Sequence, residues 1–412
     1  MSTITDSAPV RRGHTPTLVA SFLHFDLSFF LWVLLGALGA LIAKDLHLSP
    51  SQKGFLVAVP ILTGSLARIP LGFLADRHGA RRVGLMMLAL LYVPLAMGAL
   101  AGRTYGAMLL VGALLGTAGA SFAVALPLAS RWYPPEKQGI VMGIAAAGNS
   151  GTVIANLTAP LLARSVGWHG VLGLATAPLT LVLLAFAVMA KESPEKPQPK
   201  TLAVYRELAK EGDLGWLSLF YAVTFGGYVG LVGFLPTFLC DQYALSPVQA
   251  GYLTALVGCA GSFVRPLGGW IADRVGAMRV LSFVFPAAAM LFALLGTLPL
   301  LPRAAVLLVG LALALGAGNG AVFQVVPQRF RAEIGVVTGI VGAIGGVGGF
   351  FLPTILGNVK QLTGSYSAAF LVLALPAATA FVALRILVTN RQDWRVGFRL
   401  PVLELPETEA AE

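Results

Sequence analysis

Apolar stretches of about twenty residues recur along the whole chain and are separated by short polar breaks. A helix needs roughly 20 apolar residues to cross the hydrocarbon core of a bilayer. Only 11% of the residues are charged and the mean hydropathy is +0.82, whereas a soluble domain carries about 25% charged residues. The composition therefore excludes an ordinary cytosolic enzyme and predicts a polytopic membrane protein.

The polar breaks divide the chain into twelve predicted membrane spans. They run approximately Leu18–Ala43, Gly54–Ala75, Val83–Ala101, Tyr105–Ser130, Gly139–Ala163, Gly170–Ala190, Leu214–Leu239, Val248–Ala272, Val280–Leu300, Ala304–Val326, Ile334–Leu356 and Tyr366–Thr389. We therefore expect an all-α membrane protein with twelve transmembrane helices in two six-helix halves.

The positions of Lys and Arg predict the orientation, because basic residues collect in cytoplasmic loops. With a cytoplasmic N-terminus, twenty basic residues fall on the cytoplasmic side, six on the opposite side, and two, Arg68 and Arg265, inside spans. The net charge of +10 is thus scattered over span ends instead of forming the basic face that nucleic acid requires. We expect a multi-pass protein of the cytoplasmic (inner) membrane, with both termini cytoplasmic and no nucleic-acid partner.

The longest polar break separates six spans from six. We expect an N-terminal half (1–190), a cytoplasmic linker (191–213), a C-terminal half (214–390) and a cytoplasmic tail (391–412).

The two halves also share a motif. The segment GFLADRHGARR at 72–82 returns as GWIADRVGAMR at 269–279, 197 residues later, and Arg68 and Arg265 have the same separation. Repeated six-span halves are typical of transporters whose site lies between the repeats near the bilayer midplane.

The two intramembrane arginines are the most informative polar residues. An ionised side chain in hydrocarbon costs several kcal/mol, so it usually faces a cavity and has a partner. Asp26 is the only acid well inside a span, so two facing arginines would keep uncompensated positive charge and attract an anion. The planar guanidinium fork suits a small flat anion such as nitrate, nitrite or formate. The alternative is that each arginine pairs with an acid or extends to the interface.

Glycines are concentrated in two corresponding stretches, Gly143–Gly151 in the fifth span and Gly339–Gly349 in the eleventh. Small residues allow neighbouring helices to approach closely. Tight packing alone would explain one such stretch. Their occurrence in both halves favours an interpretation as walls of the transport pathway.

With these motifs the chain resembles the nitrate/nitrite porters of the major facilitator superfamily over essentially its whole length. The resemblance rests on the repeated loop motif, Arg68 and Arg265, the two glycine stretches and the segment YAVTF at 221–225. It implies an anion site in which the two arginines clamp the substrate, Asn149 and Tyr221 add hydrogen bonds, and Phe29, Phe122 and Phe225 enclose it. The backbone of the family's signatures would correspond to Gly148, Gly151, Gly345, Gly346 and Gly348. Taken one by one, the aromatic residues are equally consistent with ordinary core packing.

The repeated loops also suggest a gate. Asp76, Arg77, Asp273 and Arg274 lie where cytoplasmic helix ends are expected to meet, and in the superfamily such loops look like a contact between the halves. We expect them to bias the equilibrium between inward-open and outward-open states.

Asp26 departs from the pattern expected of nitrate/nitrite exchangers, which should lack an acid in the first span. It precedes Phe29 by one turn, a spacing that places Asp26 and Phe29 or Phe30 on one helix face. An acid whose protonation responds to nearby arginines and to an arriving anion can couple transport to protons. The alternative is that Asp26 forms a fixed ion pair or caps a local backbone distortion.

The sequence thus predicts a secondary active transporter of nitrate, and of nitrite, that takes up its substrate with protons by alternating access. The alternatives are a nitrate/nitrite exchanger, or a carrier of another small anion such as formate or an organic carboxylate. No catalytic, metal-binding or cofactor-binding motif is present in the sequence, and the two cysteines form no metal cluster or disulfide framework. We expect a monomer that needs only its substrate anion, protons and the lipid bilayer.

Overall fold

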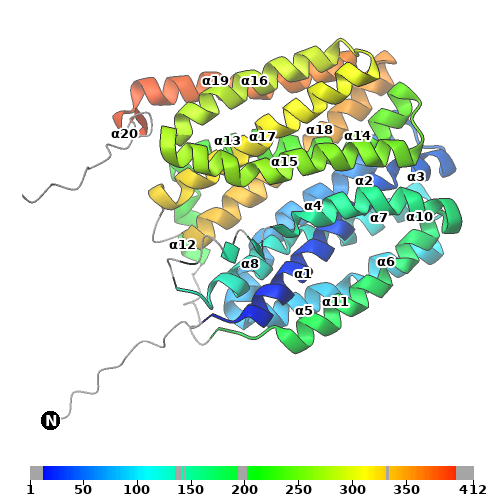
Figure 1. Cartoon of the computed structure of the whole chain (residues 1–412), viewed down its shortest axis with the longest axis horizontal. Coiled ribbons are helices and arrows are strands. Elements are labelled where there is room, and N and C mark those ends of the chain that lie inside the picture. The colour runs from blue at the N-terminus through cyan, green and yellow to red at the C-terminus, as the bar shows by residue number, and fades with distance from the viewer. Residues whose placement is uncertain are drawn as a thin grey trace, which may run out of the picture.

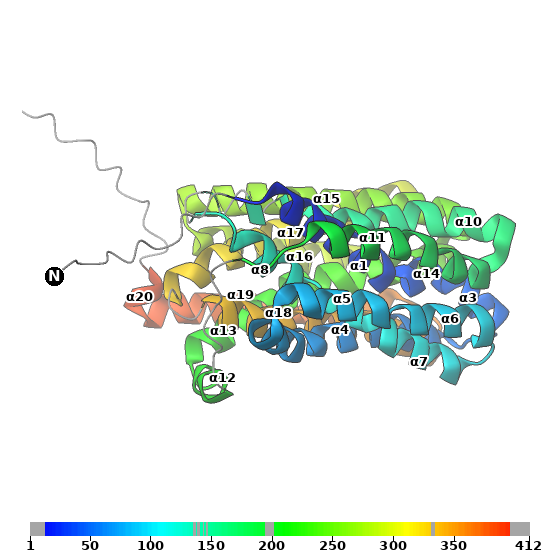
Figure 2. The same ribbon diagram turned by 90° about the horizontal axis from the view of Figure 1, so that it is seen from below.

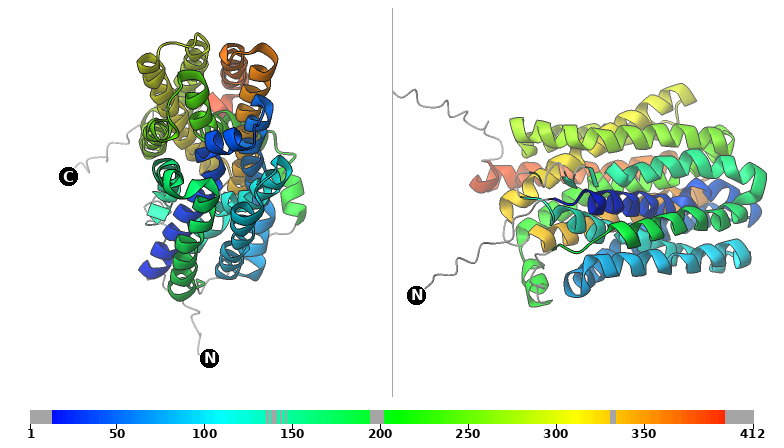
Figure 3. Two further views of the ribbon diagram at one scale, coloured as in Figure 1. Left: turned by 90° about the vertical axis from the view of Figure 1, so that its right-hand side faces the viewer. Right: turned by 60° about the horizontal axis from the view of Figure 1, so that its bottom comes forward.

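The computed structural model describes residues 13–134, 137, 141, 142, 144, 145, 147–193, 202–330 and 334–395. Over these residues the regular secondary structure is entirely helical. The helices lie along one common direction in two groups, an N-terminal group from α1 to α11 and a C-terminal group from α13 to α19 (Figure 1). Viewed end-on, the groups form two adjacent bundles (Figure 3).

The helices have the following bounds. The N-terminal half contains α1 (Thr15–Trp32), α2 (Leu34–Ala37), α3 (Gly39–Asp45), α4 (Pro50–His78), α5 (Ala80–Leu90), α6 (Tyr92–Ala101), α7 (Tyr105–Leu115), η1 (Gly116–Ala120), α8 (Phe122–Ser130), η2 (Ala147–Asn149), α10 (Ser150–Leu174) and α11 (Thr176–Met189). The remainder contains α12 (Leu202–Leu208), α13 (Gly212–Tyr221), η3 (Ala222–Gly226), α14 (Gly227–Tyr243), α15 (Pro247–Val275), α16 (Ala277–Gly296), α17 (Leu301–Arg329), α18 (Ile334–Thr363), α19 (Ser367–Asn390) and α20 (Gln392–Arg395).

These helices account for the twelve predicted spans. Ten helical stretches of the described chain are long and apolar enough to cross a membrane. One of them, residues 150–189, breaks at Gly167 (φ 69°, ψ 167°) and so contains two crossings. The consecutive helices α1, α2 and α3 supply the remaining one. Gly139 and Gly143, in the first part of the predicted fifth span, lie outside the described residues.

The outside of the bundle carries large apolar side chains. Leu181, Val188 and Phe283 are 70–79% exposed, which a soluble surface would not favour but a lipid-facing surface requires. The chain is therefore a multi-pass membrane protein of twelve helices.

The sequence repeat is reproduced in the backbone. α4 and α15 are both 29 residues long and both begin with a capping box, Ser49 with Gln52 and Ser246 with Gln249. Both end at a glycine with positive φ, Gly79 at 95° and Gly276 at 92°, a conformation that other residues adopt only with strain. Every pair is 197 residues apart, so the two halves place Arg68 and Arg265 at equivalent depths.

The start of α1 and the helices α12 and α20 lie at one end of the bundle (Figures 1 and 2). This end carries the residues predicted to be cytoplasmic, and we call it the inner end. The opposite end, with α3 and the break at Gly167, is the outer end.

The halves meet in backbone contact toward the outer end. Gly54 of α4 packs on the carbonyl of Pro353 in α18, and Gly36 of α2 packs on the carbonyl of Gly233 in α14. A Cβ atom at either glycine would collide with the opposing backbone. Only glycine permits this approach, so these contacts close the outer side of the interface.

An ion pair joins the halves at the same end. Lys53 Nζ of α4 donates to both carboxylate oxygens of Asp241 in α14, each at 2.9 Å, and the Tyr366 hydroxyl donates to Asp241 at 3.0 Å. At the inner end, Arg131 pairs with Asp76, and Asp213 pairs with Arg329 and Arg391, each within one half. Lys53 and Asp241 thus tie α4 to α14 at the outer end of the interface.

The outer ion pair should stabilise the contact between the two halves at the outer end. Cys240 lies next to Asp241 and lines an outer cavity of about 560 Å³ together with Lys44 and Lys53. We expect Lys53→Met to raise the rate at which Cys240 reacts with an external, membrane-impermeant maleimide by about two- to fivefold. This factor corresponds to the free energy that a partly exposed ion pair contributes. The measurement uses a Cys259→Ser background, in which Cys240 is the remaining thiol.

Lys44→Met is the matched control, because it removes a cation from the same cavity without breaking the ion pair. Equal labelling rates in the parent and the Lys53 variant would contradict the assignment of this pair to outer closure.

Candidate functional site

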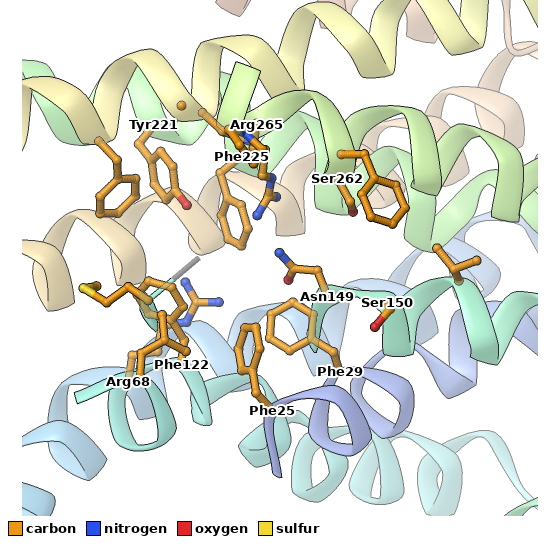
Figure 4. Close-up of a pocket in the computed structure, with 18 residues that line it drawn as sticks. Phe25, Phe29, Arg68, Phe122, Asn149, Ser150, Tyr221, Phe225, Ser262 and Arg265 are labelled. Carbon is orange, nitrogen blue, oxygen red and sulfur yellow. The ribbon is translucent and has the colours of Figure 1, made fainter. Parts of the chain in front are cut away.

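A cavity of about 340 Å³ lies between the two halves. It contains all seven side chains that the sequence predicted for substrate binding (Figure 4): Arg68, Arg265, Asn149, Tyr221, Phe29, Phe122 and Phe225. The N-terminal half contributes four of them and the C-terminal half three. The cavity therefore brings together residues that are up to 236 positions apart in the sequence, from Phe29 to Arg265.

Arg68 is buried and is held by both halves. Its Nε donates to the carbonyl of Gly119 in η1 at 3.1 Å, and its Nη1 donates to the carbonyl of Gly342 in α18 at 2.6 Å. The side chain is 3% exposed, and Nη2 has no hydrogen-bond partner among the described residues. Two of the guanidinium nitrogens thus fix its orientation, and the third is available to a ligand.

Arg265 enters from α15 and approaches the same aromatic ring as Arg68. The Phe225 ring centroid lies 5.3 Å from Arg265 Cζ and 5.1 Å from Arg68 Cζ. Arg265 also lies 5.0 Å from the Tyr228 ring, and its buried Nε has no hydrogen-bond partner among the described residues. Cation–π contacts stabilise both guanidinium groups but neutralise neither charge.

The cavity is positively charged. Among its described lining residues there are two arginines and no aspartate or glutamate. Two guanidinium charges in a space lined largely by aromatic and aliphatic groups are costly unless a counter-charge pairs with them. With at least one free N–H on each arginine, the arrangement can hold a small anion by charge-assisted hydrogen bonds from both sides.

A π-helical turn shapes the C-terminal side of the cavity. Residues 222–226 form η3. The ring of Tyr221, directly before this turn, and the ring of Phe225, within it, stack with centroids 4.9 Å apart and planes 3° apart. Such single π turns are frequent at functional sites because they redirect side chains without ending the helix. Here the turn directs both aromatic rings into the same cavity.

The five signature glycines do not line this cavity. Gly148, Gly151, Gly345, Gly346 and Gly348 are not among its lining residues, whereas the adjacent Asn149 and Ser150 are. The interpretation of the stretches as pathway walls stays a prediction.

They pack behind residues that do line it. Gly345 contacts the Tyr221 ring, Gly346 contacts Ser65 of α4, and a Cβ at Gly348 would lie 2.6 Å from the Ala222 carbonyl oxygen. The stretch therefore allows α18 to fit between α4 and η3, where it fixes Tyr221 and offers its Gly342 carbonyl to Arg68.

Asp26 faces α10 and not the arginines. Its Oδ1 accepts a 2.5 Å hydrogen bond from the Ser150 hydroxyl at the first residue of α10, and the Gly151 backbone packs on the Asp26 carbonyl. Phe29 lines the cavity whereas Asp26 does not, although Ser150 does. The Gly151 backbone packs on Asp26 and Phe30 together, so of the two expected neighbours Phe30, and not Phe29, shares the side of α1 that faces α10. The fixed ion pair and the backbone cap remain alternative predictions for Asp26.

The predicted gating residues lie at the inner end. Asp76 accepts a 2.6 Å hydrogen bond from Arg131, which directly follows α8 in the same half. Arg274 stacks over Trp270 at 3.8 Å, and Arg77 and Asp273 are exposed. Burial, with the nearby negative charge of Asp76, raises the pKa of the Tyr205 hydroxyl, which places the linker helix α12 next to Asp76.

Sequence reasoning missed one buried polar residue of the cavity, Asn319 of α17. The signal was available: it is a carboxamide between Gly318 and Gly320 in the middle of an apolar span. Phe25, Ser262 and Phe323, which also line the cavity, carry no comparable signal, because aromatic and hydroxyl residues are common in membrane helices.

The chain is similar in sequence to a known family and to several of its members. Residues 20–353 match the model of the Major Facilitator Superfamily. The chain is 37% identical to the "Nitrite extrusion protein" of Bacillus subtilis, over 90% of this chain and 94% of the relative. It is 34% identical to a Mycobacterium tuberculosis protein named "Probable nitrate/nitrite transporter NarK2", over 90% and 95%.

Among solved structures, the nucleoside transporter NupG superposes with a TM-score of 0.73 at 17% identity, covering 90% of this chain and 99% of that one. At this identity the likeness concerns the fold alone, and it agrees with the two-half arrangement of Figure 1.

Proposed function

This chain belongs to the major facilitator superfamily and, within it, to the nitrate/nitrite porters, and from that premise we propose that it is a secondary transporter of nitrate and nitrite. It works by alternating access in the cytoplasmic membrane, as a single chain with both termini in the cytoplasm. The observation that carries the proposal is the pair Arg68 and Arg265 in one cavity whose described lining holds no acid.

The geometry suits a small planar oxyanion. Nη2 of Arg68 and Nε of Arg265 supply donors from opposite halves, and a guanidinium can donate to two oxygens of nitrate or nitrite at once. Asn149 and Tyr221 provide further donors at the cavity. The surrounding phenylalanines keep water away, so each charge-assisted bond is stronger than it would be in water.

The proposal is tested by reconstituting the purified protein in liposomes and measuring nitrate uptake while the internal anion and the pH gradient are varied independently. Uptake into nitrite-loaded vesicles without a pH gradient indicates exchange, and net uptake into anion-free vesicles with an inward proton gradient indicates symport. Transport of formate or a larger carboxylate, but of neither nitrate nor nitrite, would overturn the proposal.

Replacing either cavity arginine with lysine should weaken nitrate binding by about tenfold or more, because the charge remains but the planar fork is lost. Arg68→Lys should also slow turnover, since lysine cannot donate to the Gly119 and Gly342 carbonyls and the anion together. The measurements are nitrate titration of the purified variants and initial uptake rates.

Arg103→Lys, at an exposed position in the outer loop between α6 and α7, serves as the control. Unchanged nitrate affinity in both cavity variants would show that the arginines do not clamp the anion.

We further propose that Asp26 couples uptake to protons. An empty carrier with two uncompensated arginines resists closure. Ionised Asp26, which lies behind the cavity-lining residue Ser150, reduces the positive electrostatic potential of the cavity. Asp26 reaches the cavity through Ser150, whose hydroxyl donates to it and which lines the cavity itself. An arriving anion neutralises the arginines instead, and the carboxylate can then accept a proton.

Asp26→Asn keeps the size of the side chain and removes its titration. We expect gradient-driven net uptake to fall by about tenfold or more, while nitrate binding and nitrate exchange persist. Asp45→Asn, at the outer end of the same span, is the control. If the Asp26 variant accumulates nitrate under an inward proton gradient as the parent does, then another group carries the proton and the exchanger interpretation gains support.

For the gate, we propose that Asp76, Arg77, Asp273 and Arg274 set the balance between inward-open and outward-open states. In the structure Asp76 is held by Arg131, so Asp76→Asn should change the turnover rate about threefold or more. The nitrate dissociation constant should stay within about twofold, because the pair lies outside the cavity. A loss of affinity at normal turnover would contradict this role.

A further inference from the structure

Asn319 is a buried carboxamide that the protein itself does not satisfy. Its side chain is 2% exposed, lines the cavity with the two arginines, and neither Nδ2 nor Oδ1 has a hydrogen-bond partner among the described residues. Buried amide groups are almost always paired, because leaving one unpaired costs the full desolvation of the group. The missing partner is therefore expected in the cavity that Asn319 faces.

Close backbone contacts hold Asn319 in a fixed relation to Arg265. Gly316 of α17 packs on the carbonyl of Gly261 in α15, and Gly320 packs on the carbonyl of Arg265 itself. A Cβ at either position would collide with the α15 backbone. Such small-residue contacts set the distance and rotation of two helices, so the turn that carries Asn319 and the turn that carries Arg265 form one rigid unit.

A third glycine contact extends this unit to the π turn. A Cβ at Gly318 would lie 2.6 Å from Cγ2 of Thr224 in η3. Tyr221 directly precedes η3, and Phe225 lies within it. Asn319, Arg265, Tyr221 and Phe225 thus present a single preorganised surface, which limits the loss of side-chain entropy on binding.

We propose that Asn319 donates an amide hydrogen bond to the bound anion and sets the preference for nitrate over nitrite. This inference rests on the proposed function. Nitrate has three oxygens in one plane and nitrite has two. Nη2 of Arg68 and the guanidinium of Arg265 can bind two oxygens of either anion, whereas a further donor from the C-terminal half meets a third oxygen only in nitrate.

The selectivity follows from unequal pairing. When nitrate is bound, the Nδ2 group of Asn319 regains the hydrogen bond that it lost on burial. When nitrite is bound, that donor stays without an oxygen partner in a dry cavity. A site with a buried donor discriminates against an analogue that lacks the matching acceptor. Asn319 should therefore favour nitrate, and Asn319→Ala should reduce the difference between the affinities for nitrate and nitrite.

The test is equilibrium titration of the purified full-length protein with nitrate and with nitrite, for the parent and for Asn319→Ala. We expect the nitrate dissociation constant to rise by about tenfold or more, the loss of one hydrogen bond to a charged partner. The nitrite constant should change by less than about twofold. Asn156→Ala is the matched control: Asn156 is equally buried, but its amide donates to the Thr152 carbonyl at 2.8 Å and it does not line the cavity.

A near-isosteric variant tests the orientation independently. Asn319→Asp places a carboxylate where we expect the anion and beside Arg265, so it should abolish binding of both anions. Thermal melting in detergent confirms that each variant is folded, and Asn319→Ser, which retains a short donor, replaces the alanine variant if that one does not fold.

The outcomes separate the two proposals. A parent protein that binds neither nitrate nor nitrite overturns the proposed function. A parent that binds both, with an Asn319→Ala variant that weakens them equally or not at all, overturns the inference alone. Normal anion binding by Asn319→Asp also overturns the inference, because a carboxylate facing the anion could not be tolerated.

Discussion

Two guanidinium charges share one cavity with no acid among its described lining residues, and the surrounding structure depends on holding them there. Arg68 is fastened by carbonyls from both halves, and the ring of Phe225 contacts both guanidinium groups. Like charges in an apolar space repel strongly, so the fold supplies rigid carbonyls and a ring face in place of a carboxylate. A carboxylate would neutralise the site permanently. Carbonyls and aromatic rings instead orient the two cations without neutralising them, so the positive charge remains available to attract an anion.

The repeat gives the two halves the same helical framework, but the repeated arginines have different contacts. α4 and α15 have the same length, the same cap and the same terminal glycine. Even so, Arg68 is bound on two sides, while the Nε of Arg265 has no hydrogen-bond partner among the described residues and its guanidinium rests on two aromatic rings. The difference arises from the neighbours: α18 offers a carbonyl to Arg68, and the π turn of the C-terminal half offers rings to Arg265.

Much of this arrangement could be predicted from the sequence, because membrane spans and repeats are encoded by composition and spacing. The arginine pair and the family's aromatic positions all lie in the cavity. What could not be predicted depends on how each helix is rotated about its axis, which hydropathy does not encode in helices that are apolar on every side. For that reason the sequence could not predict that the Asp26 carboxylate turns toward Ser150, or that the signature glycines pack behind the residues that line the cavity.

The packing also indicates where the halves can pivot. The outer contacts combine glycine backbone packing with an ion pair between Lys53 and Asp241, whose side chains are 19% and 24% exposed. A partly exposed ion pair contributes about 1 kcal/mol or less. The Arg68–Gly342 hydrogen bond crosses between the halves at the depth of the cavity, where a rocking motion displaces helices least. A transporter needs two states separated by only a few kcal/mol. A weak outer ion pair that can break, beside a central hydrogen bond at the depth of the cavity, is compatible with two states of similar free energy.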